Sequence, residues 1–180
     1  MILLGFCGFL RYDELIHIKQ GDVIFQGTHM KVFVEKSKCD QYREGRWVHI
    51  AASYKETCPV KNVKLYFEKA DMIDDECHDL FIFRGVTKTK HYEKLRVMNK
   101  PLSYTRVREI VLATLKSIGL NERLYGTHSL RAGGATHSAN AGIPDRLWKR
   151  HGRWKSDKSK DMYVQDSLEK LLSVTNNMGI

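Results

Sequence analysis

The chain has 180 residues, of which 42% are hydrophobic, and a formal net charge of +9. This length allows one domain with a hydrophobic core, and this apolar content excludes an intrinsically disordered protein. No apolar run approaches the roughly 20 residues that a membrane-spanning helix needs, and the opening MILLGFCGFL lacks the basic start and cleavage site of a signal peptide.

The first third of the sequence changes from helical to strand-like periodicity. Apolar residues at helical spacing predict a helix from the start of the chain to about Lys19. β-forming residues then alternate with polar ones as far as Ala51, and turn sequences at 26–28 and 44–45 interrupt them. We therefore expect a three-stranded antiparallel sheet, with strands around residues 23–25, 32–34 and 47–51.

The remaining sequence is typical of helices joined by loops. We expect a helix wherever a Pro or a capping hydroxyl precedes an apolar stripe. Residues 84–100 are polar and charged instead, and they predict a long loop. The fold class is therefore α+β, mostly helical, in one domain over residues 1–180. The predicted helices start at Pro59, Ser103, Thr127, Pro144, Ser156 and Ser167.

The four cysteines, Cys7, Cys39, Cys58 and Cys77, contain no Cys-x-x-Cys pair. Their wide spacing predicts neither a disulfide framework nor a zinc site. We expect reduced thiols in an intracellular protein.

Positive charge is concentrated in one third of the chain. Residues 101–160 contain twelve Lys and Arg against four Asp and Glu, so this segment carries +8 of the total +9. A concentrated basic field predicts a polyanionic partner, most simply nucleic acid. A generally basic, soluble surface is the alternative.

The most basic region contains a His-x-x-Arg pattern, His128 and Arg131, at the start of a predicted helix. Both side chains project from the first helical turn, where the helix dipole favours a bound anion. The small residues that follow, AGGAT, indicate a place where a backbone or a ligand comes close. A hydrogen-bonded surface pair is the alternative for His128 and Arg131. Arg11 ends an apolar run, where an arginine needs an anionic partner.

Taken in order, these motifs identify a family. Between residue 6 and about residue 172, the chain resembles the catalytic domain of the tyrosine recombinases, or integrases. The GRW form of one motif resembles recombinases of eukaryotic mobile elements and a subset of phage enzymes. The resemblance implies that an N-terminal DNA-clamping domain is absent here and that the first helix is truncated. The motifs are Arg11 in GFLRYDEL, Lys38 in VEKSKCD, His128 and Arg131 in THSLRAGGAT, Trp154 in HGRWKSD, and Tyr163 in DMYVQ.

The resemblance implies a role for each of these residues and requires no metal or cofactor. Arg11 and Arg131 would hold a DNA phosphate, since a planar guanidinium donates two parallel bonds to it. His128 and Trp154 would donate further bonds, Lys38 would protonate the leaving oxygen, and Tyr163 would be the nucleophile. The alternatives are Lys36 for Lys38, His151 for Trp154, core packing for Trp154, and a helix-face aromatic for Tyr163.

Double-stranded DNA is the expected partner, with no membrane involved. The C-terminal apolar stripe after Ser167 would dock on another copy of the chain or fold back on its own domain. The location would be the nucleus of a eukaryote or the cytoplasm of a bacterium. A type IB topoisomerase and a catalytically inactive DNA-binding module are the rival interpretations. The residues expected to contact the DNA backbone are Arg146, Lys149, Arg150, Arg153, Lys155 and Lys158.

Overall fold

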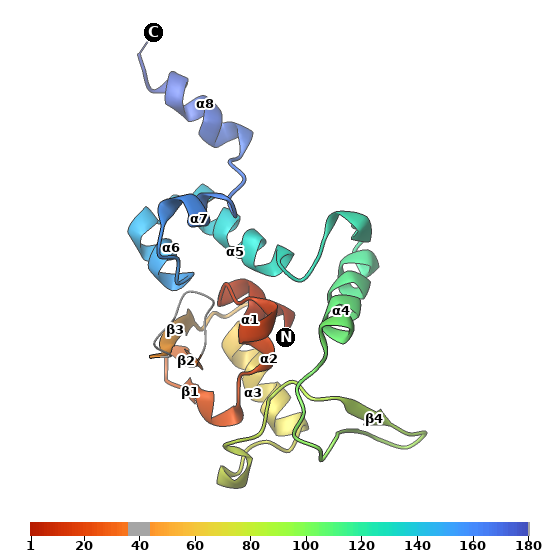
Figure 1. Ribbon diagram of the computed structural model, residues 1–180. Coiled ribbons are helices and arrows are strands. Elements are labelled where there is room, and N and C mark those ends of the chain that lie inside the picture. Colours follow the sequence, from red (N-terminus) through yellow and green to blue (C-terminus); the bar gives the residue numbers. More distant parts are fainter. Residues whose placement is uncertain (36–43, 180) are drawn as a thin grey trace.

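The computed structural model describes residues 1–35 and 44–179. Within these ranges it is an α+β structure in which helices dominate (Figure 1). The strands are β1 (Val23–Phe25), β2 (His29–Val34), β3 (Arg46–Ala51), β4 (Val86–Lys88) and β5 (Glu93–Leu95). The helices are α1 (Ile2–Cys7), α2 (Tyr12–Ile16), α3 (Pro59–Lys69), α4 (Tyr104–Ser117), α5 (Ser129–Asn140), α6 (Asp145–His151), α7 (Asp157–Asp161) and α8 (Leu168–Asn176).

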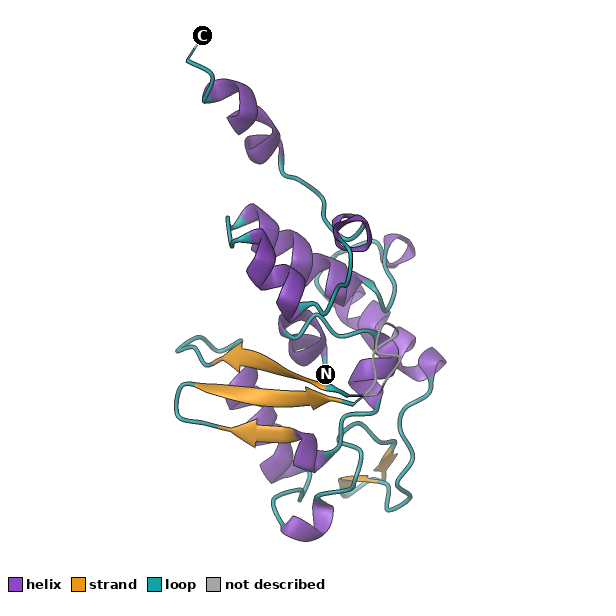
Figure 2. Ribbon diagram, turned by 60° about the vertical axis from the view of Figure 1, so that its left-hand side comes forward, coloured by secondary structure: helices purple, strands orange, loops and turns teal. Residues whose placement is uncertain are grey.

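The predicted three-stranded antiparallel sheet is confirmed, with the order β1-β2-β3. Val32 at the centre of β2 pairs with Val23 of β1 and with Val48 of β3. Alternate residues of β2 are buried, as the period-two pattern requires, and they pack with Val63 and Phe67 of α3. Figure 2 shows α3 against the sheet, so the largest core cluster lies between them.

The first predicted helix is wrong as one continuous element. Gly8, Phe9 and Leu10 separate α1 from α2, and Phe9 adopts a left-handed backbone with φ of 48°. This turn sends the Phe9 side chain into a second core cluster with Trp148 and Trp154. Burial of an aromatic ring here outweighs the helical periodicity on which the prediction was based.

Two further predictions need correction. The segment 84–100 holds an antiparallel hairpin of β4 and β5, in which Thr87 pairs with Lys94, instead of an unstructured loop. Thr127 is buried and is not the cap of α5, because His128 occupies that position without a side-chain capping bond. The caps predicted at Ser103, Ser156 and Ser167 are confirmed, since each hydroxyl accepts a backbone N–H.

α5 packs closely on α1 through the glycines of the AGGAT sequence. A Cβ at Gly134 would lie 2.4 Å from the carbonyl oxygen of Phe6 and 2.7 Å from the ring of Phe9. The small residues therefore allow the backbone of Phe6 to come close. Of the two possibilities left open by the sequence, a backbone or a ligand, the structure shows the backbone.

Replacement of Gly134 by Ala should destabilise the fold by about 1–3 kcal/mol, because overpacking here pushes against backbone. This cost should exceed the gain in helix propensity of about 1 kcal/mol that Ala brings. Urea denaturation measures the difference. Gly126→Ala is the matched control, because no atom lies within 4 Å of the added Cβ. Equal stability of both variants would show that α1 and α5 are not held at this spacing.

The C-terminal helix α8 points away from the rest of the molecule (Figures 1 and 2). Its apolar side chains Leu168, Leu171, Leu172 and Val174 are exposed, so the predicted apolar stripe exists but has no covering surface within the described chain. None of the helices in the described ranges has the length and apolar character needed to cross a membrane.

Candidate active site

Arg11 lies at the N-terminus of α2, directly after the turn that contains Phe9. Its Nη1 donates to Oε1 of Glu14 at 2.9 Å, and its backbone N–H donates to Oε2 of the same carboxylate at 2.9 Å. Burial opposes the charge of Arg11, but the Glu14 carboxylate, and after it the Tyr163 hydroxyl, raise the pKa of Arg11. Arg11 is thus half-buried between a carboxylate and the predicted nucleophile.

Glu14 is the shared counter-ion of three arginines. Its side chain is 2% exposed, and Oε2 lies 2.8 Å from Nη2 of Arg153 and 3.9 Å from Nη1 of Arg131. Burial alone would raise the pKa of Glu14, but Arg153 and the Arg11 N–H hold it below its usual value. A buried carboxylate with these partners stays ionised and orients the guanidiniums around it.

Arg131 is completely buried in the middle of the cluster. Its Nη1 donates to the carbonyl of Phe9 and its Nη2 to the carbonyl of Gly152 at 2.6 Å, so it joins two turns that are distant in sequence. Burial is the main cause that lowers the pKa of Arg131, and the positive charge of Arg11 is the second. Its Nε has no hydrogen-bond partner among the described residues.

Trp154 and Tyr163 cover the guanidinium of Arg131. The guanidinium carbon lies 4.1 Å from the centre of the Trp154 ring and 5.1 Å from that of Tyr163, while the two rings are 5.4 Å apart. Trp154 is 5% exposed and packs on Trp148 and Phe9, so it forms part of the core. Its Nε1 is also buried and has no partner in the described chain.

Tyr163 lies just beyond the end of α7 and not on a helix, so it is not the helix-face aromatic that the sequence left as an alternative. The extended segment that follows it is fastened to α5 by two side chains one turn apart. Thr136 donates to the carbonyl of Tyr163 at 3.1 Å and accepts the N–H of Gln165 at 3.2 Å. Asn140 bonds the carbonyl of Gln165 and the N–H of Ser167, each at 3.1 Å. These four bonds hold Tyr163 beside the arginines of its own chain.

The position of Arg153 differs from the prediction that this residue contacts the DNA backbone. It is 5% exposed, and its guanidinium donates to the carbonyls of Gly8 at 3.2 Å and Phe9 at 3.0 Å, besides its bond to Glu14. Its backbone is left-handed, with φ of 59°. The residue therefore braces the turn before Arg11 from inside the protein, and it does not lie on an exposed basic surface.

The other predicted residues lie outside this cluster. His128 is exposed, and its ring makes no hydrogen bond or ion pair with the described residues. Lys38 and its alternative Lys36 fall outside the described ranges. Lys149 is partly buried and pairs with Asp157 at 2.7 Å. The remaining DNA-contact candidates are exposed: Arg146, Arg150, Lys155 and Lys158.

His151 has a structural position, which does not suit it as the alternative to Trp154. Its Nε2 donates to the carbonyl of Cys7 at 2.7 Å, since a carbonyl can only accept. Burial is the main cause that lowers the pKa of His151 below its usual value. The bond to Cys7 opposes this shift, and the positive charge of Arg153 adds to it.

This lowered pKa predicts a pH-dependent stability. Between the folded and unfolded pKa values the unfolded state binds the extra proton, so the free energy of unfolding should rise with pH up to about 6.5. The contribution of His151 is complete above that pH and is lost as the pH falls towards the folded pKa. Urea denaturation from pH 5 to 8 should show a smaller pH slope for His151→Gln, which keeps a donor for Cys7. An identical slope in both proteins would contradict the assignment.

Sequence reasoning missed Glu14, Thr136 and Asn140. The i,i+3 spacing of Arg11 and Glu14 could have indicated their pairing. The spacing of Thr136 and Asn140 shows only that both lie on one helix face. Nothing in the sequence indicates which segment that face binds.

Comparison with known proteins shows the family to which the chain belongs. Residues 1–170 match the phage integrase family. An integrase/recombinase XerD homolog of Selenomonas ruminantium is 31% identical over 166 residues, which are 92% of this chain and 46% of that protein. The chain therefore spans about half the length of the relatives it matches.

Solved recombinase structures share the fold. The XerH site-specific recombinase, in a post-cleavage complex with a palindromic difH substrate, matches 97% of this chain and 43% of its own, with a TM-score of 0.68 at 15% identity. The XerA recombinase gives a TM-score of 0.68 at 19% identity, over 97% of this chain and 55% of its own. The match along nearly the whole sequence and the shared fold lead to one conclusion: the chain belongs to the phage integrase family, and its fold is that of a tyrosine recombinase catalytic domain.

Proposed function

We propose that this chain is the catalytic part of a site-specific DNA recombinase that breaks and rejoins DNA through a 3′-phosphotyrosyl intermediate. One observation carries the proposal: the phenol of Tyr163 lies against the guanidiniums of both Arg11 and Arg131. The two guanidiniums place positive charge beside the oxygen that would attack phosphorus and beside the phosphate that it would attack.

The arginines would stabilise the phosphate in the transition state. Arg11 and Arg131 would donate to its non-bridging oxygens, where charge accumulates during displacement. Arg131 is fully buried under the Tyr163 ring. A phosphate therefore reaches Arg131 only when DNA binding displaces that ring, and the four bonds to Thr136 and Asn140 would limit the displacement.

Cleavage would form the bond between Tyr163 Oη and phosphorus and break the bond to the 5′ oxygen. The phenolic proton is lost to solvent or to His128, and Lys38 protonates the departing 5′ oxygen. Attack by the 5′-hydroxyl of another strand reverses both bond changes and releases Tyr163. The phosphodiester energy is kept in the covalent intermediate, so no nucleotide cofactor is consumed.

Trp154 would contribute its indole N–H to a non-bridging oxygen. The buried and unpartnered Nε1 supports this role, because a donor left unsatisfied in the protein interior costs free energy. The packing of the ring on Trp148 would fix the direction of that N–H.

The exposed cations of α6 and α7, Arg146, Arg150, Lys155 and Lys158, with Lys149, would contact the DNA backbone. The exposed leucines of α8 suit docking on a second copy, which would place two catalytic domains on one DNA site. Both features support a homo-oligomer assembled on double-stranded DNA.

A nicked suicide duplex tests the function. The short fragment between the cleavage site and the nick leaves with a free 5′-hydroxyl and diffuses away, so a recombinase accumulates a protein–DNA adduct that survives denaturation. We expect this adduct, and peptide mapping should locate the DNA on Tyr163. Binding without an adduct, or an adduct on another residue, would overturn the proposal.

A further inference from the structure

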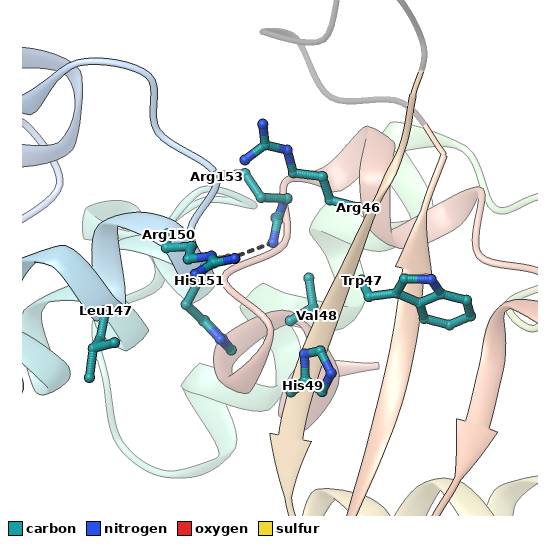
Figure 3. Close-up of a pocket in the computed structure, with 8 residues that line it drawn as sticks. All are labelled: Arg46, Trp47, Val48, His49, Leu147, Arg150, His151 and Arg153. Atoms are coloured by element: carbon teal, nitrogen blue, oxygen red, sulfur yellow. Dashed lines mark hydrogen bonds between the residues drawn. The ribbon is translucent and has the colours of Figure 1, made fainter.

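A cavity of about 600 Å³ lies between β3 and α6, next to the candidate active site (Figure 3). Arg46 and His49 line it from β3, and Arg150, His151 and Arg153 line it from α6 and the turn that follows. The volume is within the range of ordinary ligand sites. Three arginines and two histidines thus surround one hollow.

This pocket has no acidic side chain among the described residues that line it. Figure 3 shows the guanidinium groups of Arg46, Arg150 and Arg153 gathered at one end of it. Within residues 1–35 and 44–179, the side chains of Arg46 and Arg150 form no hydrogen bond or ion pair. Within the described residues, no carboxylate therefore compensates the positive charge of these two side chains.

The cations of the pocket also disfavour one another. The pKa of Arg153 is lowered, mainly by burial. Glu14 opposes this shift, and the positive charges of Arg11 and Arg46 add to it. The Nε of Arg153 is buried and has no partner in the described chain. Such an arrangement costs free energy unless an anion enters it.

The pocket shares a wall with the catalytic cluster. Nη2 of Arg153 lies 2.8 Å from Glu14, which in turn binds Arg11 at 2.9 Å. DNA carries a phosphate at every nucleotide. A strand whose cleaved phosphate is held by Arg11 therefore has further phosphates on either side of it.

We propose that the pocket between β3 and α6 binds a second phosphate of the DNA backbone, adjacent to the phosphate that is cleaved. This assignment rests on the proposed function. Arg46 and Arg150 hold the phosphate oxygens, and Arg153 links the occupied pocket to Glu14 and Arg11. The second phosphate sets the register of the strand, because a duplex held at two points cannot slide along its axis.

The salt dependence of DNA binding tests this site. Each phosphate contact contributes about −0.9 to the slope of log K against log salt. Fluorescence anisotropy with an intact duplex should give a slope about 1 smaller in magnitude for the Arg46→Gln/Arg150→Gln variant. Lys64→Gln/Lys69→Gln on α3 removes the same charge away from the pocket and should leave the slope nearly unchanged.

Two results would overturn the second phosphate site. One is an equal slope for wild type and the pocket variant. The other combines equal slopes on DNA with an effect of inorganic phosphate at constant ionic strength. If phosphate stabilises DNA-free wild type but not the variant, the pocket is a free-anion site. The adduct assay on wild type remains separate. A smaller slope for the pocket variant without any adduct from wild type would support a phosphate contact in the pocket and reject the recombinase.

Discussion

Tyr163→Phe should abolish the covalent protein–DNA adduct completely while leaving the fold and DNA affinity close to those of wild type. The change removes one oxygen atom, and that oxygen is the proposed nucleophile. The remaining contacts of the residue do not use the hydroxyl. The ring packs on Trp154 at 5.4 Å and covers Arg131, and Thr136 bonds the backbone carbonyl of residue 163.

The hydroxyl also lies close enough to Arg11 to contribute to its raised pKa, so Arg11 would lose that interaction in this variant. Glu14 still holds that guanidinium, and we expect the stability to change by about 1 kcal/mol or less. Adduct formation on the suicide duplex, circular dichroism and duplex affinity are the three measurements. Tyr54→Phe is the matched control, because Tyr54 is fully exposed. Adduct at wild-type yield in Tyr163→Phe would remove Tyr163 from the mechanism.

The sequence predicted the sheet and most helix boundaries, because period-two alternation and hydroxyl caps are local signals. The break between α1 and α2 is not local. Phe9 leaves the helix to pack on Trp148 and Trp154, which lie about 140 residues further on. The hairpin of β4 and β5 was missed for another reason: its strands are short and largely exposed, so they carry no apolar alternation.

The candidate site also contains residues that the sequence could identify and residues that only distant contacts reveal. Motif order identified Arg11, Arg131, Trp154 and Tyr163, and these four side chains lie together. Arg153 was assigned to the surface because it lies in a basic run, and only the tertiary structure brings Glu14 to it. Charge counted along a sequence cannot distinguish an arginine that binds DNA from one that neutralises a buried carboxylate.

Glu14→Ala should destabilise the folded protein by about 3–5 kcal/mol, the cost of removing one partner from a buried ion pair. Two of its partners, Arg131 and Arg153, are almost inaccessible to water and would keep their charge without a counter-ion. Glu14→Gln should cost less, because its amide oxygen can still accept one of these bonds.

A second arginine–glutamate pair in this chain provides the control. Arg106 and Glu109 have the same i,i+3 spacing and a separation of 3.0 Å, against 2.9 Å for Arg11 and Glu14, but both lie on the surface of α4. Glu109→Ala should change the free energy of unfolding by no more than about 1 kcal/mol. The two pairs differ in burial and in the number of arginines that share the carboxylate, so comparing the two variants measures what the buried cluster adds to a simple surface pair.

The pH dependence supplies the sign of the Glu14 contribution. Because its folded pKa is lowered, the carboxylate stabilises the protein fully above its unfolded pKa of about 4.5. That stabilisation is lost as the pH falls through the folded pKa. Urea denaturation should therefore show a large gap between wild type and Glu14→Gln at pH 7 and a smaller gap near pH 3. A gap that stays constant would mean that Glu14 acts by shape and hydrogen bonding, and that its charge does not organise the arginines.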